Sequence, residues 1–75
     1  MIVRYWAGAK RAAGVEEESV AADTITELRD LLAARPELTK VAAVASFLID
    51  GQQAGEDTVL HDGAEVDVLP PFAGG

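Results

Sequence analysis

The segment of residues 24–34 is the one stretch with a clear helical pattern, and it constrains the fold more than any other feature. Thr24 and Glu27 stand at the spacing of a capping box, in which the threonine side chain accepts a hydrogen bond at the start of a helix. Apolar residues then recur on one predicted face, at Ile25, Leu28, Leu31 and Leu32. Pro36 disfavours helical backbone at the residue before it, so the helix is expected to end near Ala34. This helix must bury its apolar face against a remainder that is rich in strands.

Four other segments are typical of strands, because apolar residues alternate or run together in them between turn residues: 1–7, 16–22, 45–50 and 65–69. Residues 8–14 are predicted to be a connection, and residues 52–60 to be irregular with at most one short strand. A second, short helical turn is expected to open at Pro36 and to run through Leu38 and Val41. The dipeptides Asp50-Gly51 and Asp62-Gly63 predict turns.

This order of elements predicts an α+β domain, with a mixed sheet of four to five strands, one main helix and a short second helix. A ferredoxin-like split βαβ arrangement would need a second full helix after the third strand, and residues 51–64 carry two glycine turns and no helical stripe. If the first two strands form a hairpin and the last strand returns beside the first, the fold is the β-grasp, or ubiquitin-like, roll. Residues 1–69 then form the domain. Residues 70–75 form a flexible tail, because Pro70 and Pro71 cannot donate to a sheet.

The composition excludes most side-chain catalysis. Among 75 residues there is no cysteine and a single histidine, which removes cysteine-based zinc sites and thiol nucleophiles and leaves no expected metal site. Ser19 and Ser46 would have only His61 as a base, without a third group to orient it. We interpret His61 and the run Glu16-Glu17-Glu18 as solvated surface. No P-loop or dinucleotide spacing is present, so no bound cofactor is expected, and ATP, if used, is bound by another protein.

The charge is acidic and unevenly distributed. The net charge is −7; residues 1–40 hold all six bases and carry −1, whereas residues 41–75 carry −6. Nucleic acid and anionic membrane surfaces are therefore unsuitable partners, and an acidic surface could steer the chain towards a basic protein. No secretory signal or membrane-spanning apolar run is visible, so a cytoplasmic location is expected.

The most unusual feature is the ending Gly74-Gly75. Glycine has no Cβ, so such an end is thin enough to thread into another protein's active site. The carboxylate of Gly75 would be the reactive group there. Adenylation by ATP would make it a good electrophile, and attack by a sulfur donor would then give a thiocarboxylate. The alternative without a function is a frayed chain end.

The sequence resembles the MoaD/ThiS family of ubiquitin-like sulfur carriers in four places. They are the start of the first strand (Met1-Ile2-Val3), Gly14, the segment Asp62-Gly63-Ala64-Glu65-Val66, and the ending from Leu69 to Gly75. The Pro-Pro ending is more similar to small subunits of molybdopterin synthase than to the thiamin branch. The resemblance implies that Gly75, preceded by Phe72, Ala73 and Gly74, is activated by an E1-like adenylyltransferase that uses ATP. It further implies docking to the large synthase subunit, two small subunits on a dimer of large ones, and sulfur donation to cyclic pyranopterin monophosphate.

A docking surface is also predicted from strand alternation. Val66 and Val68 are expected to face the helix, which leaves Asp67 and Leu69 on the open face; Val3 and Tyr5 likewise point inward, which leaves Arg4 and Trp6 outside. If the first and last strands are parallel neighbours, then Trp6, Leu69 and Phe72 gather near the tail as partner-binding residues. Burial of Trp6 in the core is the alternative. Gln53 stands where relatives often have an apolar residue, which would reduce the docking patch.

Three other functions stay open at this point. The carrier could serve thiamin thiazole or cysteine biosynthesis. The chain could be a ubiquitin-like modifier that Gly75 joins to lysines, or a β-grasp interaction module without terminal chemistry. In every reading the chain has no catalytic side chains of its own.

Overall fold

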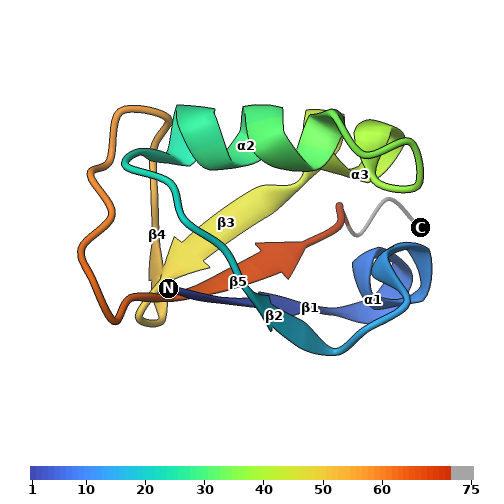
Figure 1. Ribbon diagram of the computed structural model, residues 1–75, viewed down its shortest axis with the longest axis horizontal. Coiled ribbons are helices and arrows are strands. Elements are labelled where there is room, and N and C mark those ends of the chain that lie inside the picture. Colours follow the sequence, from blue (N-terminus) through green and yellow to red (C-terminus); the bar gives the residue numbers. More distant parts are fainter. Residues whose placement is uncertain (72–75) are drawn as a thin grey trace.

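The computed structural model describes residues 1–71, which form a five-stranded mixed sheet covered on one face by helices (Figure 1). The strands are β1 (Ile2–Tyr5), β2 (Glu17–Ser19), β3 (Ser46–Ile49), β4 (Gln52–Gln53) and β5 (Glu65–Leu69), and the helices are α1 (Ala7–Ala13), α2 (Ile25–Ala33) and α3 (Thr39–Val44). The strand order is β2-β1-β5-β3-β4, with β1 and β5 parallel and the other pairs antiparallel. The predicted β-grasp roll is confirmed, including the return of the last strand beside the first.

Helix α2 crosses one face of the sheet and supplies much of the core (Figure 1). Its predicted cap is present, because the backbone N–H of Glu27 donates to Thr24 Oγ1 at 3.2 Å. Ile25, Leu28 and Leu32 are buried against inward residues of β1, β3 and β5. The prediction that Leu31 belongs to the buried stripe was wrong, because this residue is 44% exposed. It lies at the margin of the stripe, where the helix surface turns away from the sheet.

Residues 8–14 contain a helix, α1, and the prediction of a plain connection was wrong. The segment is rich in alanine, the best helix former. Gly14 ends the helix in the left-handed conformation, with φ of 77°, and its N–H donates to the Lys10 carbonyl. Seven residues give less than two full turns, so no apolar periodicity could reveal this helix from the sequence. The first strand therefore stops at Tyr5 instead of continuing to residue 7.

Two other predicted boundaries moved. The second strand is confined to Glu17–Ser19, and the short helix begins at Thr39 rather than at Pro36. The single O–H of Thr39 is shared, at 2.7 and 3.0 Å, between the carbonyls of Ala33 and Arg35, which lie at and beyond the end of α2. These bonds satisfy carbonyl groups that a helix end leaves free. Within the described part of residues 52–60, β4 is the one short strand.

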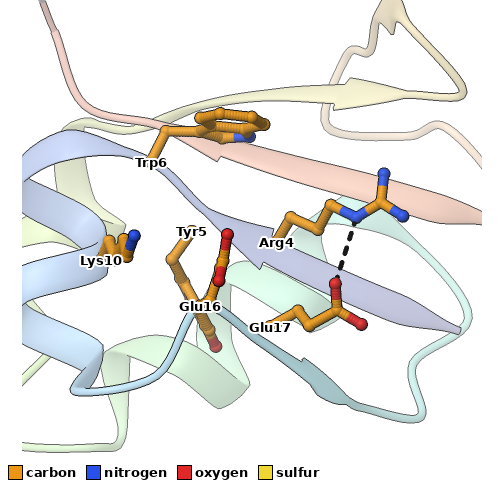
Figure 2. Close-up of a pocket in the computed structure, with 6 residues that line it drawn as sticks. All are labelled: Arg4, Tyr5, Trp6, Lys10, Glu16 and Glu17. Atoms are coloured by element: carbon orange, nitrogen blue, oxygen red, sulfur yellow. Dashed lines mark ion pairs between the residues drawn. The ribbon is translucent and has the colours of Figure 1, made fainter.

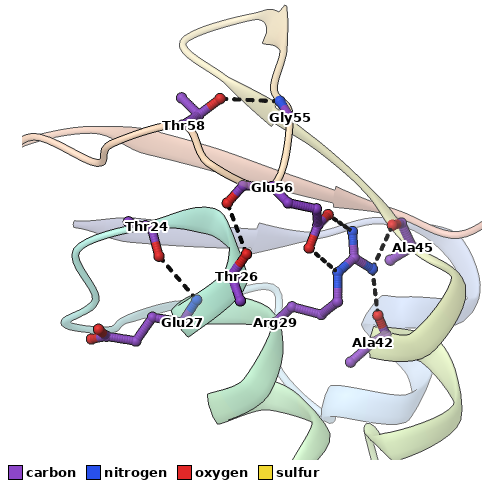
Figure 3. A network of polar contacts seen from close by, with 9 residues as sticks. All are labelled: Thr24, Thr26, Glu27, Arg29, Ala42, Ala45, Gly55, Glu56 and Thr58. Carbon is purple, nitrogen blue, oxygen red and sulfur yellow. Dashed lines mark hydrogen bonds and ion pairs between the residues drawn. The ribbon is translucent and has the colours of Figure 1, made fainter.

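Arg29 on α2 joins three parts of the chain (Figure 3). Its guanidinium donates to the carbonyls of Ala42 and Ala45 at the end of α3, at 2.6 and 3.0 Å, and to both carboxylate oxygens of Glu56, at 2.6 and 3.1 Å. The same group lies 4.7 Å from the centre of the Phe47 ring. This bidentate, charge-assisted pairing fixes the loop after β4 against the helical layer. It also lowers the pKa of the Glu56 carboxyl.

The parallel pairing of β1 and β5 sets where the chain emerges. Both strands run towards α1, so Pro70 and Pro71 leave the sheet at the end where α1 lies (Figure 1). The loop that precedes β5 lies at the opposite end. In residues 1–71, no helix has the length and hydropathy that crossing a bilayer requires.

Candidate functional site

The candidate site is the end of the sheet from which the chain continues towards Gly75. Leu69 closes β5 and is partly buried, and Pro70 and Pro71 follow it. The two prolines fix φ at successive positions and therefore restrict the direction in which the chain leaves. The predicted tail residues Phe72, Ala73, Gly74 and Gly75 lie outside the described residues, so their role stays a prediction.

Trp6 occupies the junction between β1 and α1, and it faces solvent. The residue is 50% exposed, as the strand alternation predicts, and the alternative of a core tryptophan is wrong. Its backbone N–H donates to the Val68 carbonyl on β5 at 3.2 Å, and its carbonyl accepts the N–H of Ala9 at 3.0 Å at the start of α1. Trp6 is thus tied to both neighbouring elements while its side chain stays available.

A hollow of about 500 Å³ lies beside Trp6 at the tail exit. It is lined mainly by small and apolar side chains, with one cation at its rim: Trp6, Ala7, Gly8, Arg11, Leu69, Pro70 and Pro71. The structure therefore places two of the three predicted docking residues, Trp6 and Leu69, in one concave surface. Such a surface can receive an apolar side chain of a partner.

A smaller hollow of about 260 Å³ lies on the β2 side of Trp6, and most of the residues that line it are charged (Figure 2). Arg4 lies along it and pairs with Glu17 at 3.5 Å and with Glu65 at 2.6 Å. Lys10 and Glu16 line the same hollow. Trp6 thus lines both the hollow with charged residues and the mainly apolar one at the tail exit.

Two bases of α1 lie next to the site. Lys10 and Arg11, like Lys40 on α3, form no ion pair within residues 1–71, whereas the three other arginines are all paired with carboxylates. Both lie in the last turn of α1, where a cation suits the helix dipole. The sequence interpretation missed this group because it treated residues 8–14 as a connection.

Tyr5 anchors the end of β1 from inside. Its hydroxyl donates to Glu18 Oε2 at 2.6 Å, and Arg35 Nη1 donates to the same oxygen at 2.6 Å. Burial, followed by the hydrogen bond to Glu18, raises the pKa of the Tyr5 hydroxyl well above its usual value. The hydroxyl therefore stays protonated and keeps donating, which holds β1 and β2 together next to the site.

The other residues that the sequence singled out do not assemble into a catalytic group. His61 is exposed, and its ring contacts Asp50 at 2.9 Å and the Asp62 carbonyl at 2.8 Å. Ser46 is also exposed but opens β3, whereas Asp50 follows the far end of that strand. Gln53 is exposed on β4, the edge strand two positions from β5.

Comparison with known proteins agrees with this architecture. The sequence matches the ThiS family over residues 3–75. A molybdopterin synthase sulfur carrier subunit from Chlamydomonas reinhardtii is 32% identical over 79 residues, which cover 97% of this chain and 95% of that protein.

Solved structures give the same result. In a complex of subunits 1 and 2 of the molybdopterin-converting factor from Helicobacter pylori, the similar chain has a TM-score of 0.76 and 27% identity, with 99% of this chain and 96% of that chain covered. Small archaeal modifier protein 1 from Methanosarcina acetivorans has a TM-score of 0.83 and 26% identity, with 99% and 94% covered.

The fold and the tail exit define a ubiquitin-like β-grasp protein. The match over nearly the whole chain goes further: the chain belongs to the ThiS family. The family resemblance expected from the sequence is thereby confirmed.

Proposed function

We propose that this protein is a sulfur carrier, the small subunit of a molybdopterin synthase, and that its working group is the carboxylate of Gly75. The observation that carries the proposal is the 32% identity, over 97% of this chain, to a molybdopterin synthase sulfur carrier subunit. The likeness to one chain of a two-subunit molybdopterin-converting factor supports a large-subunit partner.

The proposed chemistry has two steps on Gly75. First, a carboxylate oxygen attacks the α-phosphorus of ATP in an E1-like adenylyltransferase, and pyrophosphate leaves. Second, a donor of sulfide-level sulfur (HS⁻) attacks the carbonyl carbon, the carbon–oxygen bond to AMP breaks, and AMP and a proton leave. The product is a thiocarboxylate, whose sulfur is a good nucleophile. In the proposed synthase this sulfur is passed to cyclic pyranopterin monophosphate, and two such transfers would complete a dithiolene.

The described geometry supports a tail that acts inside a partner. Pro70 and Pro71 restrict the exit of the chain, which lowers the conformational entropy lost when the tail is ordered. Trp6 and Leu69 line the hollow beside this exit, and Phe72 follows directly in the sequence. We propose that these three residues bind the partner, because large apolar anchors dominate interfaces.

Intact-protein mass spectrometry tests the proposal. After incubation with the activating enzyme, ATP and a sulfur source, the chain should gain the mass difference between sulfur and oxygen. The product, mixed with the large subunit and cyclic pyranopterin monophosphate, should yield molybdopterin. Deleting Gly75, or adding one residue after it, should abolish both results while circular dichroism and melting stay unchanged. Retained sulfur loading in the deletion variant would overturn the proposal.

Gly55→Ala is the matched control. Gly55 has open space around its Cα, and its φ is not in the left-handed region, so an added methyl group meets nothing. This variant should load sulfur like the parent chain, because it changes a glycine far from the tail.

A ubiquitin-like modifier is the second candidate, favoured by the likeness to small archaeal modifier protein 1. A modifier would also need Gly75, so deletion does not separate the two functions. Conjugates do: a modifier appears in cells as higher-mass adducts joined to lysines, and a pure carrier does not. If the chain delivered sulfur only to a thiazole synthase or to a cysteine-forming acceptor, it would still be a sulfur carrier, but it would belong to a pathway other than molybdopterin synthesis.

A further inference from the structure

The Trp6 indole is held by a side chain that lies 61 residues away in the sequence. Its Nε1–H donates to Asp67 Oδ1 at 3.0 Å, from the end of β1 to the neighbouring strand β5. Figure 2 shows the indole lying over β5. Half of the tryptophan surface is nevertheless exposed, so packing alone does not fix the ring.

Asp67 is available for this bond because its cationic neighbour is engaged elsewhere. Arg4 stands opposite Asp67 in the parallel register of β1 and β5. Its guanidinium instead contacts Glu65 at 2.6 Å and Glu17 at 3.5 Å. Within residues 1–71, Asp67 has no ion pair, and its side-chain contact is the indole N–H. Because Arg4 is engaged with Glu65 and Glu17, the carboxylate of Asp67 is free to accept the hydrogen bond from Trp6.

We propose that Asp67 is a positioning residue for partner docking, and that it preorganises the Trp6 indole as one wall of the hollow at the tail exit. The inference rests on the proposed function, because it takes Trp6 to be an interface anchor. The indole, held over β5, keeps open the hollow that Leu69, Pro70 and Pro71 complete. Without the bond, the ring could occupy other rotamers, and docking would have to order it again.

The size of the effect follows from the strength of one hydrogen bond. A hydrogen bond to a charged group contributes modestly in water, and ordering a free side chain on binding carries a further entropic cost. Together they predict that losing the Asp67 contact weakens partner binding about five- to twentyfold. The fold itself should lose little, because the bond lies on the open face, outside the core.

The test is a double-mutant cycle on Asp67→Ala and Trp6→Phe, with affinity for the proposed large subunit measured by titration calorimetry. Asp67→Ala should weaken binding about five- to twentyfold in the parent chain, and about twofold or less in the Trp6→Phe background, since phenylalanine has no N–H to hold. Asp67→Asn keeps an acceptor oxygen without the charge and should bind nearly like the parent chain. Equal losses in both backgrounds, or no loss in the parent chain, would overturn the inference.

Two measurements on the isolated chain separate positioning from a structural role. In Asp67→Ala the indole N–H resonance should shift upfield and its hydrogen exchange should accelerate, while the melting temperature stays within a few degrees of the parent value. A large fall in melting temperature that accounts for the lost affinity would overturn the positioning role. Sulfur loading of Gly75, followed by mass, stays intact if only this inference fails, whereas failure of the proposed function removes the loading itself.

Discussion

A single residue turns the chain from β1 into α1 in a conformation that its side chain disfavours. Ala7 has φ of 49°, in the left-handed region, where a Cβ crowds the backbone. The turn is required because Trp6 is tied on one side to β5 and on the other to the first turn of α1. The local strain therefore belongs to the geometry that presents Trp6.

We expect Ala7→Gly to stabilise the fold by about 0.5–1 kcal/mol, because glycine adopts this φ without the Cβ contact. Chemical denaturation monitored by circular dichroism would measure the change. Ala43→Gly is the control: Ala43 is an exposed residue of α3 with ordinary helical backbone, and the variant should lose about 0.5–1 kcal/mol. Equal destabilisation by both substitutions would show that Ala7 carries no strain.

The pair of Asp50 and His61 makes one stability contribution dependent on pH. Hydrogen bonding to Asp50 raises the pKa of His61, and the same bond lowers the pKa of Asp50. The histidine contribution is complete below the unfolded pKa of about 6.5 and is lost as the pH rises through the folded pKa. The aspartate contribution is complete above the unfolded pKa of about 3.9 and is lost as the pH falls through the folded pKa.

The parent chain should therefore exceed His61→Gln in melting temperature most clearly between about pH 4 and about pH 6.5, and the difference should shrink at about pH 8. Thermal melts of both proteins over this range would measure it. The effect should be small, because both groups are exposed and water screens their attraction. A difference that grows towards alkaline pH would contradict the assignment of the bond.

At the scale of elements, α2 is the helix whose removal would cost the fold most. Leu28→Ala and Leu32→Ala should each destabilise the protein by about 2–5 kcal/mol, because both side chains are buried in the core. In a domain of this size that approaches the whole stability. Leu31→Ala in the same helix is the control, and its 44% exposed side chain should cost less than about 1 kcal/mol. Denaturant titration of the three variants measures the contrast, and a similar loss in all three would mean that α2 is packed differently.

The elements that could be predicted are those with a complete local signal. The cap at Thr24 starts α2, the alternation of Glu65 to Leu69 matches β5 at both ends, and the turn at Asp50-Gly51 joins β3 to β4. Helix α1 could not be predicted from periodicity, because its seven residues bury only Ala9 completely. Its local signals were its alanine content and Gly14, which takes the left-handed conformation of a helix end.

The site was predictable only as far as strand alternation reaches. Alternation and the parallel pairing of β1 and β5 bring Trp6 and Leu69 to one end of the sheet, as predicted. The bond from Trp6 to Asp67 depends on the rotamer of an exposed side chain, which no sequence pattern specifies. The unpaired bases of α1 were missed with the helix itself. The proposed role of residues 72–75 in the chemistry is argued from the sequence and from membership of the family.

For the whole molecule, the two ends of the sheet differ in charge, and the tail leaves from one of them. The loop from Ala54 to Ala64 lies at the end opposite the tail exit and carries Asp57 and Asp62, in addition to Glu56, whose charge is paired with Arg29 (Figure 1). On α1, Arg11 lines the hollow at the exit, and Lys10 lines the hollow next to it on the other side of Trp6. The molecule therefore has an acidic end and a more basic docking end, within a net charge of −7. A basic partner would attract the chain from a distance, whereas the contact at α1 favours acidic side chains.

This arrangement predicts that salt slows association with the proposed large subunit. Attraction between a chain of charge −7 and a basic partner acts at long range, and salt shortens that range to about 10 Å at 0.1 M. Stopped-flow measurements should therefore show an association rate that falls as salt is added, with a dissociation rate that changes little. An association rate independent of salt would exclude electrostatic steering.

Variants at the two ends of the molecule should change different rate constants of association with the partner. The comparison shows which end contributes to electrostatic steering. Asp57→Asn and Asp62→Asn remove charge far from the tail exit, so together they should reduce the association rate several-fold at low salt and leave the dissociation rate unchanged. Arg11→Gln changes the rim of the hollow itself, so it should mainly raise the dissociation rate if an acidic partner group contacts α1. Trp6→Phe, which keeps the charge, should leave the salt dependence as it is. If the distal aspartate variants instead raised the dissociation rate as Arg11→Gln does, the loop from Ala54 to Ala64 would itself belong to the interface, and docking would extend well beyond the tail exit.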